Sequence, residues 1–101
     1  MDLEEQVMGI IINAGQSRSL CYEALNSAKA GDFADADEKM GQAQHFAREA
    51  HRVQTQLIEA DEGEGTTKMT LVTVHAQDHL MTSILAKELV GELIELYRTR
   101  H

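Results

Sequence analysis

The segment VHAQDHLM, from Val74 to Met81, places groups that could do chemistry inside an apolar stretch. His75 and His79 are four residues apart, so they share one face if the segment is helical. A neutral imidazole can attack a phosphoryl donor and then pass the group on as phosphohistidine. That chemistry needs hydrogen-bond donors for the phosphate. Gln77 and His79 are candidates for these donors, within one chain or from an adjacent subunit.

Two other interpretations of the histidines stay open on spacing alone. His75, His79 and Asp78 could form a transition-metal site, although the order His-x-x-Asp-His lacks the glutamate of the His-Glu-x-x-His zinc motif. The pair could also be partly buried, hydrogen-bonded packing residues. The remaining histidines, 45, 51 and 101, are expected to be structural or solvated.

The elements that position these groups are predicted to be helices. Proline is absent, aromatic residues make up 4% of the chain, and helix-forming residues dominate. Gly31 suits a helix end and Asp32 suits the next N-cap. A glycine-containing stretch over 60–67 marks a second break, after which Thr66 or Thr67 can cap. We therefore expect an all-α, antiparallel three-helix bundle in a single domain, 1–101, with helices at 3–30, 33–60 and 67–99.

Two glycines inside the first predicted helix, Gly9 and Gly15, are a local irregularity. Glycine weakens a helix interior, but it also allows another backbone to come close. Both consequences remain possible at these positions.

The third helix has an unusually wide apolar surface. On a helical wheel with Asp78 at zero, seven large apolar side chains fall within about 60° of the aspartate, and further apolar residues extend the arc past half the circumference. A bundle of 101 residues cannot bury so much of one helix, so we expect self-association. The seven are Leu71, Val74, Met81, Leu85, Leu89, Leu93 and Leu96.

Asp78 lies at the centre of this arc. Its negative charge needs a compensating partner, because an isolated carboxylate in an apolar interface is unfavourable. If the oligomer is cyclic, copies of Asp78 converge on the axis and a hard divalent ion such as magnesium would offset their repulsion. The alternative is an aspartate at the interface margin, hydrogen-bonded to water or to Thr82.

Composition excludes several classes of protein. The formal net charge of −8 disfavours nucleic acid and anionic membrane surfaces as partners. No segment has the length and hydropathy of a membrane span, and the N-terminus lacks the order of a signal peptide. Cys21 is the single cysteine, which rules out an internal disulfide and favours an inert buried thiol. We therefore expect a cytoplasmic protein.

Three segments together are similar to a known family. They are LVTVHAQDHLMTS at 71–83, VMGIIINAGQSRS at 7–19, and AHRVQTQLIE at 50–59 followed by GEG at 63–65. The chain resembles the enzyme IIA component of the bacterial sugar phosphotransferase system, of the lactose/cellobiose/chitobiose type.

The resemblance implies a homotrimer of three-helix subunits in which His75 is phosphorylated. His75 would accept the group from the histidine-containing phosphocarrier protein and pass it to a cysteine of enzyme IIB during disaccharide uptake. Asp78 would hold a divalent cation, usually magnesium, at the trimer axis. Gln77 and His79 fall beside the active histidine as candidate phosphate contacts.

The alternative function is a non-catalytic helical adaptor or structural oligomer, in which the histidines only pack. The sugar stays open among cellobiose, chitobiose and lactose, with a slight preference for the first two.

Overall fold

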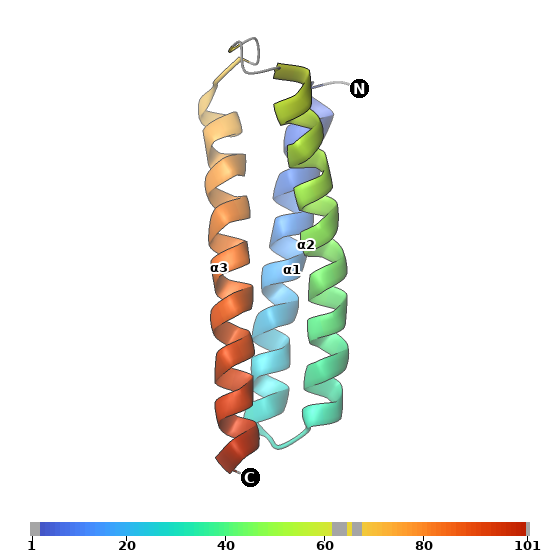
Figure 1. Cartoon of the computed structure of the whole chain (residues 1–101), viewed down its shortest axis with the longest axis vertical. Coiled ribbons are helices and arrows are strands. Elements are labelled where there is room, and N and C mark those ends of the chain that lie inside the picture. Colours follow the sequence, from blue (N-terminus) through green and yellow to red (C-terminus); the bar gives the residue numbers. More distant parts are fainter. Residues whose placement is uncertain (1–2, 62–64, 66–67, 101) are drawn as a thin grey trace.

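The computed structural model describes residues 3–61, 65 and 68–100. Over these residues the chain forms three helices and no strand: α1 (Leu3–Lys29), α2 (Phe33–Asp61) and α3 (Leu71–Arg100). The helices run up and down the long axis of a body measuring 52 × 20 × 18 Å, so that α2 is antiparallel to both of its neighbours (Figure 1). The prediction of an all-α, three-helix antiparallel arrangement is confirmed.

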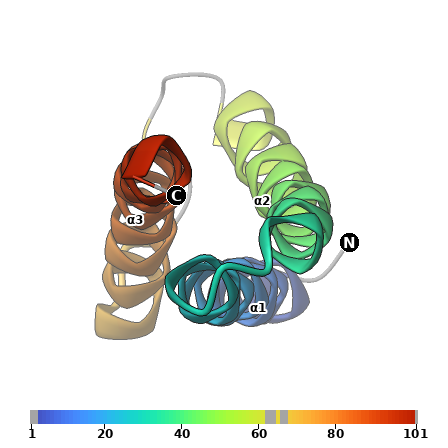
Figure 2. The ribbon, with the colours of Figure 1, turned by 90° about the horizontal axis from the view of Figure 1, so that it is seen from below.

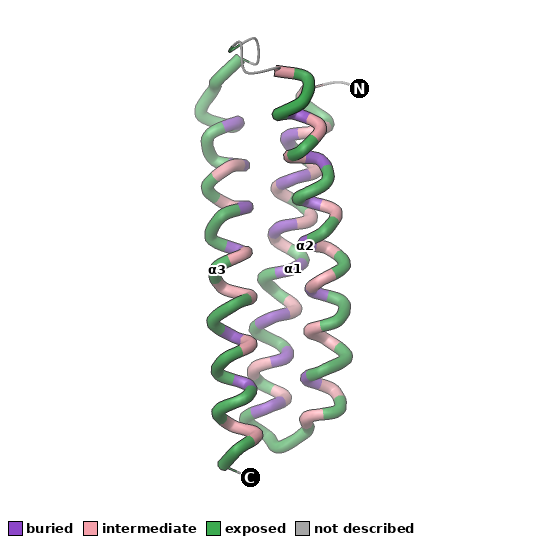
Figure 3. The backbone as a smooth tube through the Cα atoms, viewed as in Figure 1, coloured by how far each residue is buried: buried purple, intermediate pink, exposed green. Residues whose placement is uncertain are grey.

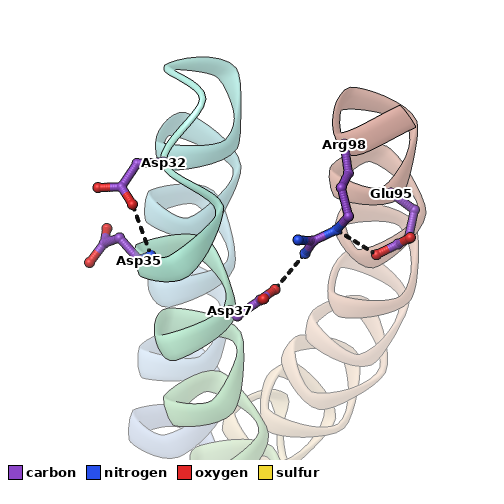
Figure 4. Close-up of polar contacts among 5 residues, drawn as sticks. All are labelled: Asp32, Asp35, Asp37, Glu95 and Arg98. Carbon is purple, nitrogen blue, oxygen red and sulfur yellow. Dashed lines mark hydrogen bonds and ion pairs between the residues drawn. The ribbon is translucent and has the colours of Figure 1, made fainter. Parts of the chain in front are cut away.

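The turn between α1 and α2 forms as its residue types predicted. Gly31 has a φ of 84°, which glycine adopts without the strain that a side chain would cause. Its N–H donates to the carbonyl of Ala28 at 3.0 Å, and the N–H of Asp32 donates to that of Ser27 at 2.9 Å. This pattern is a Schellman motif. The carboxylate of Asp32 then accepts from the N–H of Asp35 at 3.1 Å, which caps α2 (Figure 4).

The start of α3 differs from the prediction by four residues. The helix begins at Leu71, and Thr70 is its N-cap. The Thr70 hydroxyl accepts from the N–H of Thr73 at 3.2 Å, and the Thr70 carbonyl accepts from that of Val74 at 2.9 Å. The predicted caps, Thr66 and Thr67, lie outside the described residues. Three threonines with equal capping ability stand close together here, so composition could not select the one that does it.

The core is built mainly on α1, which lies against both other helices (Figure 2). Small side chains dominate it, with alanines at most contacts between α1 and α2, so these two helices can approach closely. The buried apolar residues form one cluster near each end of the bundle. Between these two clusters, the fully buried hydroxyl of Ser17 on α1 donates to the carbonyl of Ala43 on α2 at 2.9 Å.

The contact between α2 and α3 has a different character, because polar side chains bridge these two helices. Near the upper end, the amides of Gln54 and Gln77 form a reciprocal pair of hydrogen bonds. At mid-height the ammonium of Lys87 donates to Gln44. At the lower end Arg98 pairs with Asp37 at 2.7 Å (Figure 4). A polar seam thus closes the bundle on the side that α1 does not cover.

The buried Ser17 hydrogen bond gives a stability prediction. Replacing Ser17 with Ala removes a buried bond and leaves no gap of consequence, so we expect a loss of about 1 kcal/mol in the free energy of unfolding. The matched control is Ser19→Ala, on the exposed side of the same helix. Urea denaturation at one fixed protein concentration would measure both. Equal unfolding free energies for the two variants would contradict a stabilising role for this bond.

Candidate functional site

The outward surface of α3 carries most of the large apolar side chains of that helix. The residues that α3 buries are of two kinds: Thr73, Ala76 and Ser83 are small or polar, whereas Leu80, Val90 and Ile94 are large and apolar. Its leucine-rich face is left in solvent, which gives the helix a long exposed outer edge (Figure 3). The expectation of an apolar surface too wide for the chain's own core is confirmed. The exposed fractions lie between 41% and 89% for Leu71, Val74, Met81, Leu85, Leu89, Leu93 and Leu96.

Asp78 is exposed at the middle of this outward face, where the wheel placed it. The hydroxyl of Thr82 donates to the carbonyl of His79 at 3.2 Å, so the expected alternative of a Thr82 bond to Asp78 is not seen. Across the described residues, no group of three or more His, Cys, Asp and Glu side chains could hold a metal ion.

His75 and His79 lie together on the flank of α3 that is turned toward α1. Their rings are parallel, with centroids 5.8 Å apart and planes 8° apart. His75 is exposed, whereas His79 is half-buried. Burial lowers the pKa of His79 below its ordinary value, and the positive charges of Arg18 and His75 add to this effect. The His79 ring is therefore mainly neutral at pH 7, with one N–H to donate and no added positive charge beside His75.

Gly15 on α1 lies next to the His79 ring. A Cβ atom at this position would lie 3.4 Å from Nε2 of His79, which is van der Waals contact. The nearest neighbour of this glycine is therefore a side chain and not another backbone. Gly9, in contrast, borders open space, with no atom within 4 Å of a Cβ added there. The sequence singled out Gly15 but could not name its neighbour, and it gave no signal for Arg18.

Gln77 does not join the two histidines within one chain. Its amide lies on the opposite flank of α3, where it is engaged with Gln54 across the polar seam. Two residues along a helix correspond to a rotation of about 200°, which puts Gln77 and His75 on opposite sides of the Asp78 face. The structure thus brings together two of the three predicted phosphate-handling residues.

Two of the other residues named from the sequence, His45 and Cys21, lie against neighbouring side chains of the bundle. The ring of His45 lies edge-on to that of Phe46, with centroids 5.2 Å apart. Cys21 is fully buried, and burial raises the pKa of its thiol despite the opposing charge of Lys87. His101 lies outside the described residues. Among the described helices, none is both long and apolar enough to cross a membrane.

An exposed histidine beside a second, neutral histidine is an arrangement that could accept and release a phosphoryl group. The family comparison agrees, since residues 5–98 match the family described as "PTS system, Lactose/Cellobiose specific IIA subunit". The chain belongs to this family, and it is a phosphotransferase component that carries a phosphoryl group in disaccharide uptake. This membership favours the carrier over the helical adaptor.

Individual relatives support the same conclusion. The chain is 64% identical to the N,N'-diacetylchitobiose-specific EIIA component of Escherichia coli strain K12, over 95% of this chain and 83% of that protein. It also matches the solution structure of the E. coli IIA(Chitobiose)–HPr complex, with a TM-score of 0.85 and 61% identity over 98% of this chain and 96% of that one. The crystal structure of the cellobiose-specific enzyme IIA from Bacillus anthracis gives a TM-score of 0.92 and 42% identity, over 98% of this chain and 92% of that chain.

Gly15→Ala tests the packing around His79. In a helix interior, Gly→Ala should raise the unfolding free energy by up to about 1 kcal/mol. We expect this gain both for Gly15→Ala and for the control Gly41→Ala, whose added Cβ meets no atom within 4 Å. Only Gly15→Ala places a methyl group against Nε2 of His79, so only this variant should shift the His79 ring resonances in NMR spectra. Unshifted His79 resonances in Gly15→Ala would contradict the close approach of α1 and this ring.

Proposed function

We propose that His75 is the residue that carries the phosphoryl group. The observation that carries the proposal is the parallel pair of imidazole rings, in which His75 is exposed to a partner and His79 is half-buried beside it. A carrier must meet its donor and its acceptor in turn, so its nucleophile has to stand at the surface. A helix packed against its neighbour also holds that nucleophile in one orientation.

We propose the histidine-containing phosphocarrier protein, HPr, as the donor and a cysteine of enzyme IIB as the acceptor. The matched E. coli relative was solved in complex with HPr, which supports the first assignment. A ring nitrogen of neutral His75 attacks phosphorus, and the bond between phosphorus and the donor's imidazole nitrogen breaks with its electron pair. The cysteine thiolate of enzyme IIB later attacks the same phosphorus, and the electron pair of the broken bond returns to His75.

The role proposed for His79 is to donate a hydrogen bond to the phosphoryl group. Its ring is parallel to that of His75 and mainly neutral, so its N–H can face a phosphoryl oxygen without an added charge. An N–H to oxygen bond of this kind stabilises the negative charge that develops during transfer. The ring is half-buried beside Gly15 of α1, so the bundle covers one side of it.

We propose that the protein acts as a homotrimer with the Asp78 faces of three α3 helices at the axis. The exposed leucine-rich face supplies the apolar area that such an interface needs. In a ring of parallel helices, the flank of one α3 faces the opposite flank of the next. The His75 flank would therefore face the neighbour's Gln77, which gives Gln77 a route to the phosphate between subunits.

The proposed trimer also gives Asp78 its role as a metal ligand. Three carboxylates brought to one axis repel each other, and a magnesium ion would supply the compensating positive charge. The proposed ion is shared, since each chain contributes one carboxylate. Its role in the proposal is to stabilise the assembly.

For the sugar, we propose N,N'-diacetylchitobiose. The support is the 64% identity to an E. coli protein with that specificity.

The phosphorylation site can be tested directly. Incubated with enzyme I, the phosphocarrier and labelled phosphoenolpyruvate, wild-type protein and the control His45→Gln should take up acid-labile, base-stable label. His75→Gln should take up none, because the nucleophile is gone. Phosphate trapped on His75 in a mass spectrum of the wild type would identify the position. Equal labelling of His75→Gln and wild type would refute the assignment.

The Asp78 assignment predicts an unusual stability change. Asp78→Leu should keep the trimer or strengthen it, because apolar side chains replace converging carboxylates. Sedimentation equilibrium would give the oligomeric state, and thermal unfolding with and without a chelator would show the metal's contribution. We expect chelation to lower the Tm of the wild type more than that of the variant. Dissociation of Asp78→Leu into monomers would contradict an axial position for Asp78.

A further inference from the structure

A second site lies on the polar seam, away from the histidine pair. A groove of about 390 Å³ opens between α2 and α3, and basic side chains occur along both walls. It is distinct from the His75 site, because that site lies on the flank of α3 turned toward α1. The lining residues are Gln44, Ala47, Arg48, His51, Arg52, Ile84 and Lys87.

The basic character of the groove runs against the charge of the chain as a whole. The protein has 9 Lys and Arg residues against 17 Asp and Glu residues. Three of those cations, Arg48, Arg52 and Lys87, line this one groove, with His51 between them. On α2 they follow helical spacing, so one face of that helix presents both guanidinium groups to the same side.

Most of this positive charge is uncompensated. Within the described chain, Arg52 forms an ion pair with Glu49 at 2.9 Å, whereas neither Arg48 nor Lys87 has an ion pair. Lys87 is half-buried and donates to the neutral amide oxygen of Gln44, so among the described residues its ammonium meets no carboxylate. The groove therefore carries positive charge that an anion could pair with.

Lys87 also shows how deep the positive charge reaches. Its ammonium is close enough to the fully buried Cys21 of α1 to lower the pKa of that thiol against the larger effect of burial. Lys87 is half-buried, while Arg48 and His51 are exposed. Ala47 and Ile84 add an apolar surface between these charges.

We propose that this groove binds a small organic phosphate, with the phosphate group held by Arg48 and Lys87 and the carbon skeleton against Ala47 and Ile84. A guanidinium offers paired donors to phosphate oxygens, and a lysine ammonium adds a point charge. The volume lies within the range of small-molecule sites. A net charge of −8 repels an acidic macromolecule at long range, whereas a small anion responds mainly to the local field, so the small ligand is favoured.

The test uses full-length protein and glucose 6-phosphate as the probe for a phosphate monoester, with inorganic phosphate and glucose as separate arms. Isothermal titration calorimetry gives the Kd, and amide chemical shifts locate the binding. We expect saturable binding of glucose 6-phosphate, weaker binding of inorganic phosphate and none of glucose. Arg48→Gln and Lys87→Gln should each raise the Kd by about tenfold or more, which corresponds to the loss of one charged hydrogen bond.

The control variant is Lys29→Gln, which changes the net charge equally at an exposed position at the end of α1. The amide introduced by Lys87→Gln can still pair with Gln44, and Arg48 is exposed, so at least the Arg48 variant should fold. Absence of saturable binding, or equal weakening in Lys29→Gln, would overturn the proposal. Equal affinity for inorganic phosphate and glucose 6-phosphate would overturn its organic part.

A third outcome separates a protein partner from a small ligand. If Arg48→Gln slows phosphorylation by the phosphocarrier while the wild type binds no glucose 6-phosphate, the groove docks a protein and the proposal fails. The inference goes beyond the proposed function and is independent of it. His75 can be labelled from phosphoenolpyruvate even if the groove binds no organic phosphate. The groove can likewise bind an organic phosphate even if His75 is not labelled.

Discussion

The structure depends on one constraint, which is that α3 must satisfy two interfaces with a single helix. Its inner face has to fit against α1 in a bundle of only 101 residues, and it does so with small residues such as Ala76 and Ser83. Its outer face carries most of its leucines, and much of their surface is in solvent. Folding of a single chain therefore leaves a large part of the apolar surface of α3 without the stabilisation that burial gives. The proposed trimer would bury the apolar face of α3 that the monomer leaves exposed.

The histidine pair takes its properties from the border between these two faces. A residue at the border is neither in the core nor on the proposed axis, so His75 can be reached by a partner while its helix stays fixed. His79, one turn later, is half-buried, and its ring lies next to Gly15 of α1. The same half-burial lowers the pKa of His79, which favours its neutral form beside the proposed nucleophile, His75. Packing between α1 and α3 thus sets both the orientation and the protonation state of the group next to His75.

The seam between α2 and α3 follows a different rule. Apolar packing is concentrated on α1, and the two remaining helices are joined by side-chain amides and charges. Such a seam contributes little net stability, since each polar group exchanges water for a protein partner. It does allow a groove to stay open, and it permits positive charge to gather where an apolar interface would exclude it. The proposed anion site at Arg48 and Lys87 is a consequence of that looseness.

Much of this could be read from the residues themselves, because helical periodicity and capping are local properties. The turn at Gly31 and Asp32, the three helices, and the outward face around Asp78 all follow from types and spacing. The family resemblance pointed to His75 as well. Where capping residues competed, as at the start of α3, local chemistry could not decide between them.

Only the tertiary structure decided the contacts between helices. Those contacts depend on how each helix is rotated about its axis and shifted along it relative to its neighbours, which the sequence of one helix does not determine. The approach of Gly15 to the His79 ring and the hydrogen bonds of Gln77 to Gln54 are of this kind, whereas the pairing of His75 with His79 follows from their spacing on one helix. The same holds for the gathering of Arg48 and Lys87, which lie far apart in sequence and meet because α2 and α3 are antiparallel. The sequence by itself determined the helices and their faces. The tertiary structure decided which faces meet, because side chains from different helices come together only when the bundle has packed.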